Sequence, residues 1–204
     1  MNDLFERSWQ RAWSALAGDA DGIALRDELL ARYAEPQRKY HTRQHLAECL
    51  ALFEEAATLA PHPAEVEMAL WFHDAIYEVK GSGNEDRSAE WAHRALLDAG
   101  VAEACAALVR QLVLVTKHDG VPVSADEQVL VDIDLAILGA ERPRFDEYER
   151  QIRDEYGYVP GFLFRRKRKQ ILKTFLDRPV LYSTAVLRER LETRARENLK
   201  RAIG

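Results

Sequence analysis

Met68-Ala-Leu-Trp-Phe-His73-Asp74 runs from an apolar segment directly into a histidine and an aspartate. Apolar residues precede His73 by seven, four and three positions, which is the spacing of one helical face. His73 should therefore face the interior of a helical protein. Adjacent side chains cannot both point one way in mid-helix. We therefore expect the helix to end at this pair, where the turning backbone lets His73 and Asp74 reach one metal ion.

Apolar spacings of three and four continue along the 204-residue chain and predict an all-α fold. The chain has no linker rich in glycine or serine, so we expect a single-domain bundle of about 8–10 helices over residues 1–204. Two apolar runs, 109–115 and 129–133, could each be a buried strand, but their flanks favour helix. The expected helices cover residues 3–17, 22–34, 42–59, 63–74, 85–99, 102–117, 125–140, 144–156, 161–177 and 184–202.

The composition narrows the functional class. With 47% hydrophobic and 31% charged residues, the chain is neither disordered nor fibrous. Its net charge of −5 argues against broad nucleic-acid binding and against binding to anionic membranes. Two cysteines exclude a disulfide framework and fit a reducing compartment. No signal peptide and no apolar run of about 18 residues is present, so we expect a cytoplasmic protein. The oligomeric state is not indicated.

A second histidine pair lies in Tyr40-His41-Thr42-Arg43-Gln44-His45. His41 and His45 are four residues apart and share one helical face. His45 also continues an apolar stripe that includes Cys49, so it should face the core. A core-facing histidine is either a hydrogen-bonded structural residue or a ligand, and both interpretations remain open here.

An aspartate and a further histidine complete the candidate set. Asp134 shares a face with Leu130, Ile137 and Leu138, whereas Asp132 lies on a less apolar face, beside the site or at the surface. A buried carboxylate must be paired, hydrogen-bonded or metal-bound, so Asp134 either pairs with a buried arginine or binds metal. His118 ends an apolar run and could approach the same site, or it could be an exposed helix-terminal residue.

Together, four inward-facing residues form a nitrogen and oxygen donor set drawn from three helices. Imidazole and carboxylate ligands suit a divalent transition metal, namely Mn, Fe, Co, Ni or Zn. The proposed ligands are His45, His73, Asp74 and Asp134.

The order His … His-Asp … Asp resembles the HD superfamily of metal-dependent phosphohydrolases. The motifs cover about 38–140, and the helical pattern extends the resemblance to about 182. Phe72-His73-Asp74-Ala-Ile-Tyr77 and Asp132-x-Asp134-Leu-Ala-Ile-Leu-Gly139 look like a poorly characterised bacterial branch of predicted hydrolases. The resemblance implies an HD-type helical bundle that hydrolyses a small phosphate ester or nucleotide with metal-activated water. A second site could take Mg²⁺.

Tyr40-His41-x-x-x-His45 is also similar to a motif of cyclic-nucleotide phosphodiesterases. This similarity implies that His45 binds metal and that His41 acts as a general acid toward the leaving oxygen. It places His118 near the phosphate or a second metal. The phosphodiesterases carry another histidine shortly after the His-Asp pair, where this chain has Ile76-Tyr77-Glu78. Cyclic-nucleotide specificity is therefore not implied.

Basic side chains must then hold the remaining phosphate charge. In Phe164-Arg-Arg-Lys-Arg-Lys169, Arg165 and Arg168 align with Leu172 and could point toward the pocket. A solvated basic face is the alternative interpretation. Arg43 is another candidate, close to His41 in sequence. Two further function classes remain open: a di-iron HD-type oxygenase, and a non-catalytic binding or regulatory module stabilised by its metal.

Overall fold

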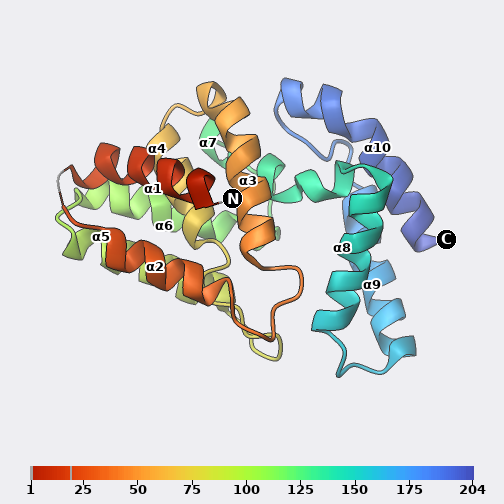
Figure 1. Cartoon of the computed structure of the whole chain (residues 1–204). Helices are drawn as coiled ribbons and strands as arrows, with labels where there is room; N and C mark the ends of the chain where they lie inside the picture. Colours follow the sequence, from red (N-terminus) through yellow and green to blue (C-terminus); the bar gives the residue numbers. More distant parts are fainter. Residues whose placement is uncertain (1, 19) are drawn as a thin grey trace.

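The computed structural model describes residues 2–18 and 20–204, and no residue in these ranges lies in a strand (Figure 1). The predicted all-α fold is confirmed. The segments 109–115 and 129–133 are helical. The described α-helices are α1 (Asn2–Ala17), α2 (Ile23–Arg32), α3 (Arg43–Ala56), α4 (Pro63–Phe72), α5 (Asn84–Asp98), α6 (Glu103–Val115), α7 (Ala125–Asp134), α8 (Arg142–Glu155), α9 (Gly161–Leu176) and α10 (Ala185–Ile203).

Two of the predicted helices are shorter than the spacing indicated. The segment expected over 42–59 divides into α3 and the 3-10 helix η1 (Ala57–Leu59), and the segment expected over 125–140 divides into α7 and the 3-10 helix η2 (Leu135–Gly139). The second division matters for function, because it makes Asp134 the last residue of α7. A side chain at a helix end is free to project away from the helix axis.

Side-chain caps explain where α3 and α7 begin. Thr42 precedes α3, and its hydroxyl accepts a hydrogen bond from the Gln44 amide at 3.2 Å. Ser124 and Glu127 form a reciprocal capping box at the start of α7. These polar residues fix where each helix starts, and thereby which residues its buried face carries.

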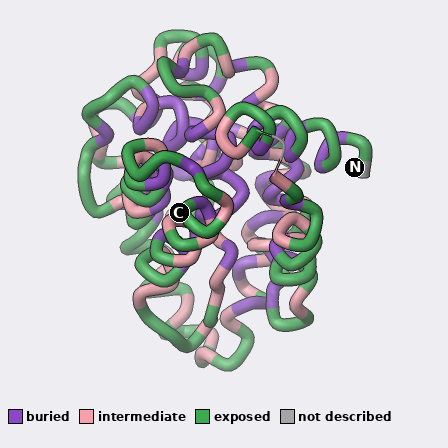
Figure 2. The backbone as a smooth tube through the Cα atoms, turned by 90° about the vertical axis from the view of Figure 1, so that its left-hand side faces the viewer, coloured by how far each residue is buried: buried purple, intermediate pink, exposed green. Residues whose placement is uncertain are grey.

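Helix α4 lies in the interior of the bundle. All residues from Glu65 to Phe72 are buried, and α4 packs against α1, α3, α5, α6 and α7. Apart from Glu65 and Glu67, its buried residues are apolar, and such a helix is stable only when neighbours cover it. Figure 2 shows the resulting interior of buried backbone inside exposed outer turns. His73 and Asp74 therefore follow directly after a buried helix that packs against five others.

The last three helices and η2 pack together at one side of the molecule (Figure 1). Helix α10 contacts η2 and α9, while α8 contacts η2. Three side chains bind this group to η2. The Tyr182 hydroxyl donates to the Leu135 carbonyl at 3.0 Å, the Asn198 amide donates to the Leu138 carbonyl at 2.9 Å, and the Arg194 guanidinium donates to the Gly139 carbonyl. Because η2 follows α7 directly, α8 and α9 are brought opposite the end of α7. Within the described ranges, no helix combines the length and apolarity that a bilayer span requires.

Candidate metal centre

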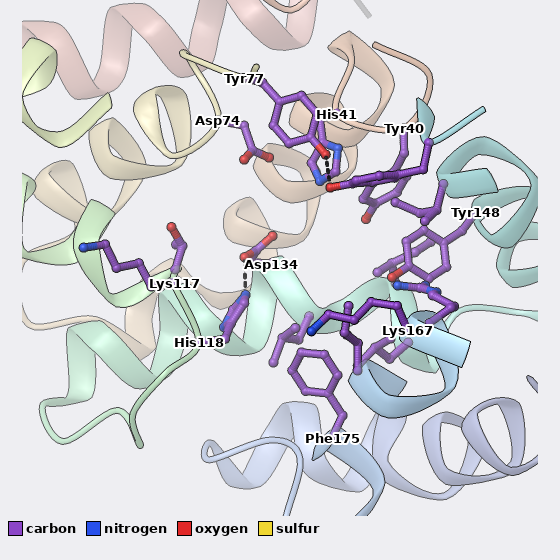
Figure 3. A pocket seen from close by; sticks show the side chains of 18 of the residues that line it. Tyr40, His41, Asp74, Tyr77, Lys117, His118, Asp134, Tyr148, Lys167 and Phe175 are labelled. Atoms are coloured by element: carbon purple, nitrogen blue, oxygen red, sulfur yellow. Dashed lines mark hydrogen bonds and ion pairs between the residues drawn. The ribbon is translucent and has the colours of Figure 1, made fainter. Parts of the chain in front are cut away.

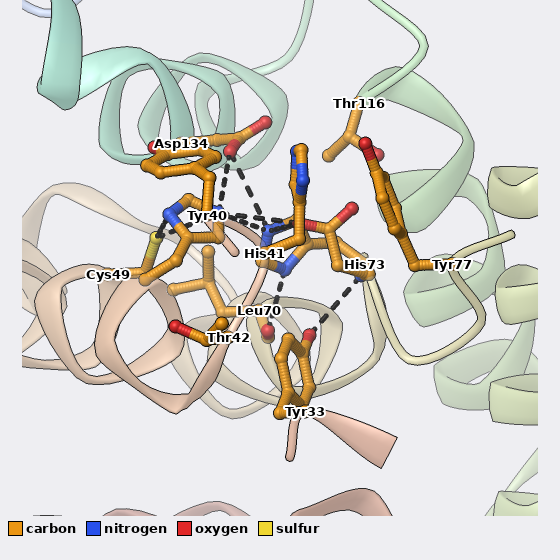
Figure 4. Close-up of polar contacts among 12 residues, drawn as sticks. Tyr33, Tyr40, His41, Thr42, Cys49, Leu70, His73, Tyr77, Thr116 and Asp134 are labelled. Atoms are coloured by element: carbon orange, nitrogen blue, oxygen red, sulfur yellow. Dashed lines mark hydrogen bonds and ion pairs between the residues drawn. The ribbon is translucent and has the colours of Figure 1, made fainter. Parts of the chain in front are cut away.

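Four side chains from α3, α7 and the end of α4 lie close together, and Figure 4 labels two of them, His73 and Asp134. His45 comes from α3, His73 and Asp74 follow α4, and Asp134 ends α7. The Nε2 atoms of His45 and His73 are 3.0 Å apart. An Asp74 oxygen lies 3.4 Å from Nε2 of His45 and 3.1 Å from Nε2 of His73. For an Asp134 oxygen the corresponding distances are 3.3 and 3.6 Å.

These separations fit a shared metal ion. Donor atoms bound to one ion at about 2.1 Å stand about 3.0 Å apart in an octahedral arrangement and about 3.4 Å apart in a tetrahedral one. The five separations above span 3.0 to 3.6 Å. The structure thus brings together all four residues that the sequence analysis proposed as ligands.

The backbone turn after α4 is held by a buried arginine. Arg38 donates to the carbonyl oxygens of Asp74, Ala75 and His41, at 2.6, 2.9 and 3.2 Å. Its side chain is fully buried. One guanidinium therefore ties the loop carrying His41 to the loop carrying Asp74. The sequence analysis did not single out this residue.

The tautomer of His73 suits a ligand. Its Nδ1 lies 2.8 Å from the carbonyl oxygen of Leu70, which can only accept a hydrogen bond. Nδ1 must therefore carry a proton and donate it, which leaves the Nε2 lone pair directed at the cluster. This backbone contact fixes both the orientation and the protonation pattern that metal binding requires.

A cysteine also lies within reach of this cluster. His45, Cys49, His73 and Asp134 form a group that could hold a metal ion. The Cys49 sulfur is 3.7 Å from Nδ1 of His45 and 3.8 Å from Nε2, so it lies beside the ring rather than in line with one nitrogen. Burial raises the pKa of the Cys49 thiol. The sequence analysis had noted Cys49 only as part of the apolar stripe, four residues after His45.

Charges within the cluster compensate each other. Burial favours the neutral form of His73, but the adjacent Asp74 carboxylate outweighs it and raises the pKa of His73. Burial likewise favours a neutral Asp134, but hydrogen bonds from His118 and His45 lower the pKa of Asp134. Protons and a divalent cation compete for the same donor atoms, so metal binding here would release protons.

His118 lies next to Asp134, as the sequence analysis had left open. Its Nε2 is 2.9 Å from an Asp134 oxygen, and its Nδ1 is buried without a partner among the described residues. The backbone of His118 has φ +56°, a left-handed conformation that is unfavourable for a residue with a Cβ atom. The Arg178 guanidinium donates to the His118 carbonyl at 3.0 Å and helps to hold this conformation.

His41 is oriented by a carboxylate that the sequence analysis missed. Its Nδ1 lies 2.8 Å from Oε2 of Glu155, and its ring stacks on Tyr77 with centroids 4.0 Å apart. Glu155 also accepts hydrogen bonds from three consecutive backbone amides, those of residues 39 to 41, at 2.8 to 3.0 Å. Burial would raise the pKa of Glu155, but the hydrogen bonds from His41 and these amides outweigh it and lower the pKa to about 2.

A cavity of about 500 Å³ opens between the cluster and the helices opposite (Figure 3). His41, Asp74, His118 and Asp134 line one side, and the opposite side includes residues of η2, α8 and α9. This volume falls in the range of small-molecule sites, about 300 to 1,000 Å³.

Only one of the predicted phosphate-binding arginines lines this cavity. Arg168 does so, paired with Glu149 and placed over the Tyr148 ring at 4.9 Å. Arg165 is exposed and lies outside the cavity, and Lys167 lines it instead. Arg43 is also exposed and outside this cavity, and its Nε donates to the Leu30 carbonyl at 2.8 Å.

Of the two positions that the sequence analysis allowed for Asp132, beside the site or at the surface, the surface is excluded. Asp132 is fully buried and accepts hydrogen bonds from the backbone amides of Ser183 and Thr184, both at 2.7 Å. The Thr184 hydroxyl adds a third, at 2.8 Å. Asp132 therefore caps the start of α10 and supports the fold next to the site.

Comparison with known proteins finds no matching family model, no matching curated protein and no matching solved structure. The donor cluster, the oriented histidine and the cavity are therefore the basis for a functional proposal.

Proposed function

We propose that this chain is a metal-dependent phosphohydrolase of the HD type that acts on a small phosphate ester or nucleotide. The observation that carries the proposal is that the oriented histidine and the donor cluster line the same cavity. His41, oriented by Glu155, lines the same cavity as Asp74 and Asp134 of the donor cluster. An acid placed beside a metal cluster, with cations across the cavity, is what phosphoester hydrolysis requires.

His45, His73, Asp74 and Asp134 would hold the ion. The imidazole and carboxylate donors suit Mn, Fe, Co, Ni or Zn. When bound, such an ion would supply Lewis acidity toward water and a phosphoryl oxygen. Asp74 is preferred over Cys49 as the fourth ligand because its oxygen lies 3.4 and 3.1 Å from Nε2 of His45 and His73, whereas the Cys49 sulfur is 3.8 Å from Nε2 of His45.

His41 would protonate the leaving oxygen. Its Nδ1 faces the Glu155 carboxylate, so Nδ1 carries the proton and Nε2 is left to act on the substrate. To act as a general acid, His41 must also carry a proton on Nε2, which it would give to the leaving oxygen. General-acid catalysis of this kind contributes about 10²- to 10⁴-fold in rate.

Two groups across the cavity could hold the phosphate. Lys167 lines the cavity and makes no ion pair with a described residue, whereas Arg168 is already paired with Glu149. Lys167 is therefore the better phosphate anchor. The Tyr40 hydroxyl lines the same cavity, is buried and lacks a hydrogen-bond partner among the described residues, so it could donate to a substrate oxygen.

One observation favours a second candidate. His118 contacts Asp134 directly, which adds a nitrogen donor beside the four proposed ligands. A larger donor set is what a di-iron oxygenase needs. Two bound irons per chain together with oxygen consumption would support that function over hydrolysis.

The proposal is tested by screening phosphoesters and nucleotides with protein loaded with each of the five metals. We expect turnover in the wild type, and a loss of about 10²- to 10⁴-fold in the His41→Asn variant with an unchanged metal content. His93→Asn is the matched control, because His93 pairs with Glu103 and does not line the cavity. A metal-loaded protein that hydrolyses none of the esters would contradict the proposal and favour a binding module.

A further inference from the structure

The cavity beside the donor cluster is divided by polarity. Charged groups occupy the side formed by the ends of α4, α6 and α7 and the start of α5, where Glu85 and Lys117 accompany the cluster. The side formed by η2, α8 and α9 carries the cations Lys167 and Arg168, and its other lining residues are aliphatic or aromatic; Figure 3 labels Tyr148, Lys167 and Phe175 there. The apolar side chains on this side include Leu135, Ile137, Leu138, Ile152, Ile171 and Phe175.

From this division we propose that the substrate is a phosphoester whose leaving group is an apolar body, aromatic or alkyl, rather than a sugar. The inference rests on the proposed function and specifies its substrate class. The phosphate would lie between the donor cluster and Lys167, and the apolar body would lie against η2 and α9. Burial of apolar surface then contributes the affinity for the leaving group.

Among the described lining residues, the buried side-chain atoms without a hydrogen-bond partner are the Tyr40 hydroxyl and Nδ1 of His118, so few such groups are left for a sugar or a base. The described lining contains no asparagine or glutamine, the side chains that pair with base edges through two hydrogen bonds. The Thr116 hydroxyl donates to its own helix, to the Val113 carbonyl at 2.7 Å. The Tyr77 hydroxyl donates to Glu155 at 3.2 Å. A sugar held against the apolar side would leave hydroxyl groups unpaired, which is unfavourable, whereas an apolar body leaves none.

Helix α9 places a cation next to this apolar side. Lys167 and Ile171 are four residues apart, so they lie on the same helical face, and both line the cavity. Ile171 is 38% exposed, so the apolar side continues to the cavity mouth. An anionic head at Lys167 and an apolar body along Ile171 therefore match neighbouring residues of a single helix.

Titration calorimetry with phosphonates tests the inference without turnover, because a carbon–phosphorus bond is not a phosphoester. The probes share one anionic head: methylphosphonate, 2-hydroxyethylphosphonate, 1-naphthylphosphonate and a nucleoside phosphonate. Each is measured with Mn²⁺ and again with a chelator. We expect 1-naphthylphosphonate to bind at least about ten-fold more tightly than the other three, a difference of about 1.4 kcal/mol.

Variants on the apolar side locate the effect. Ile171→Asn should remove most of the preference for 1-naphthylphosphonate and leave methylphosphonate binding unchanged. Ile137→Thr, from η2, provides a second variant with a small change in volume. Val186→Asn is the matched control, because Val186 is 56% exposed on α10 and does not line the cavity. It should leave all four affinities unchanged.

Three results would overturn the inference: equal affinity for all four probes, tighter binding of the nucleoside or hydroxyethyl probe, or a naphthyl preference that neither cavity variant reduces. These results are separable from failure of the proposed function. Phosphoester turnover without a naphthyl preference would refute the substrate class alone. A naphthyl preference that both cavity variants reduce, in a protein that hydrolyses no ester, would refute hydrolysis while supporting the apolar site.

Discussion

Replacing Glu155 by glutamine should separate catalysis from metal binding. The Glu155 carboxylate accepts hydrogen bonds from three backbone amides, from Nδ1 of His41 and from the Tyr77 hydroxyl. Glutamine conserves the volume but presents an amide donor where a charged acceptor was. Its NH₂ group would face a ring nitrogen that carries a proton, so His41 would lose the hydrogen-bond partner that orients it.

The size of the effect follows from the pKa of this carboxyl. A change from 4.5 in the unfolded chain to about 2 in the folded protein corresponds to about 3 kcal/mol of stability at neutral pH. Because the folded pKa is the lower one, this stability is fully present above about pH 4.5. It is lost as the pH falls through about 2. Glu155→Gln should forfeit most of it, which lowers the melting temperature by about 6 to 12 °C for a chain of this size.

Urea unfolding followed by circular dichroism, at pH 7 and at pH 3, measures this contribution. The gap in unfolding free energy between wild type and Glu155→Gln should be about 3 kcal/mol at pH 7 and narrower at pH 3. Turnover should fall by about 10²-fold or more, while metal content stays the same. An unchanged unfolding free energy, a gap independent of pH, or loss of the metal would refute this account of Glu155.

Three further predictions test separate parts of the site. Cys49→Ser should retain the bound metal, whereas Asp74→Asn should weaken metal binding by about ten-fold or more. Competition with a chelating dye measures both affinities, and the reverse ranking would make the thiol the ligand. Asp132→Asn should lower the unfolding free energy by about 2 kcal/mol in urea titrations with metal content unchanged, because it weakens the cap of α10; loss of metal at full stability would contradict this role. Lys167→Ala should raise KM for a phosphoester several-fold and Lys169→Ala should not, so equal effects in steady-state kinetics would remove Lys167 as the phosphate anchor.

The sequence predicted the donor cluster well because helical periodicity determines which face of a helix is buried. His45, His73 and Asp134 each continue an apolar stripe, and each points inward in the structure. The prediction that the helix ends at His73-Asp74 is confirmed, since α4 ends at Phe72. Local sequence pattern is sufficient to place a residue when its position depends only on which helical face is buried.

The residues that the sequence analysis missed depend on contacts between distant segments. Glu155 lies 114 residues after His41, and no spacing relates the two. One signal was available: an acid at a helix C-terminus is opposed by the helix dipole, and Glu155 ends α8. Nothing local marks Arg38, whose partners come from two separate loops.

The prediction that Arg165 points toward the pocket was wrong, because it assumed that the cavity and the core lie on the same face of α9. Arg165 and Arg168 were aligned with Leu172, which is indeed fully buried in the structure. The cavity lies beside the core rather than on the same face, and its α9 residues include Phe164, Lys167 and Ile171 as well as Arg168. Shifting the face of residues 165, 168 and 172 back by one residue gives 164, 167 and 171, all of which line the cavity.

The metal content of the purified protein tests the central claim most directly. The protein is loaded with Mn²⁺ or Zn²⁺, desalted and analysed by inductively coupled plasma mass spectrometry, in parallel with His73→Ala and with His93→Ala as the control. We expect about one ion per chain in the wild type and in the control, and almost none in His73→Ala. No retained ion in the wild type, or equal retention in all three proteins, would contradict a metal centre at His45, His73, Asp74 and Asp134.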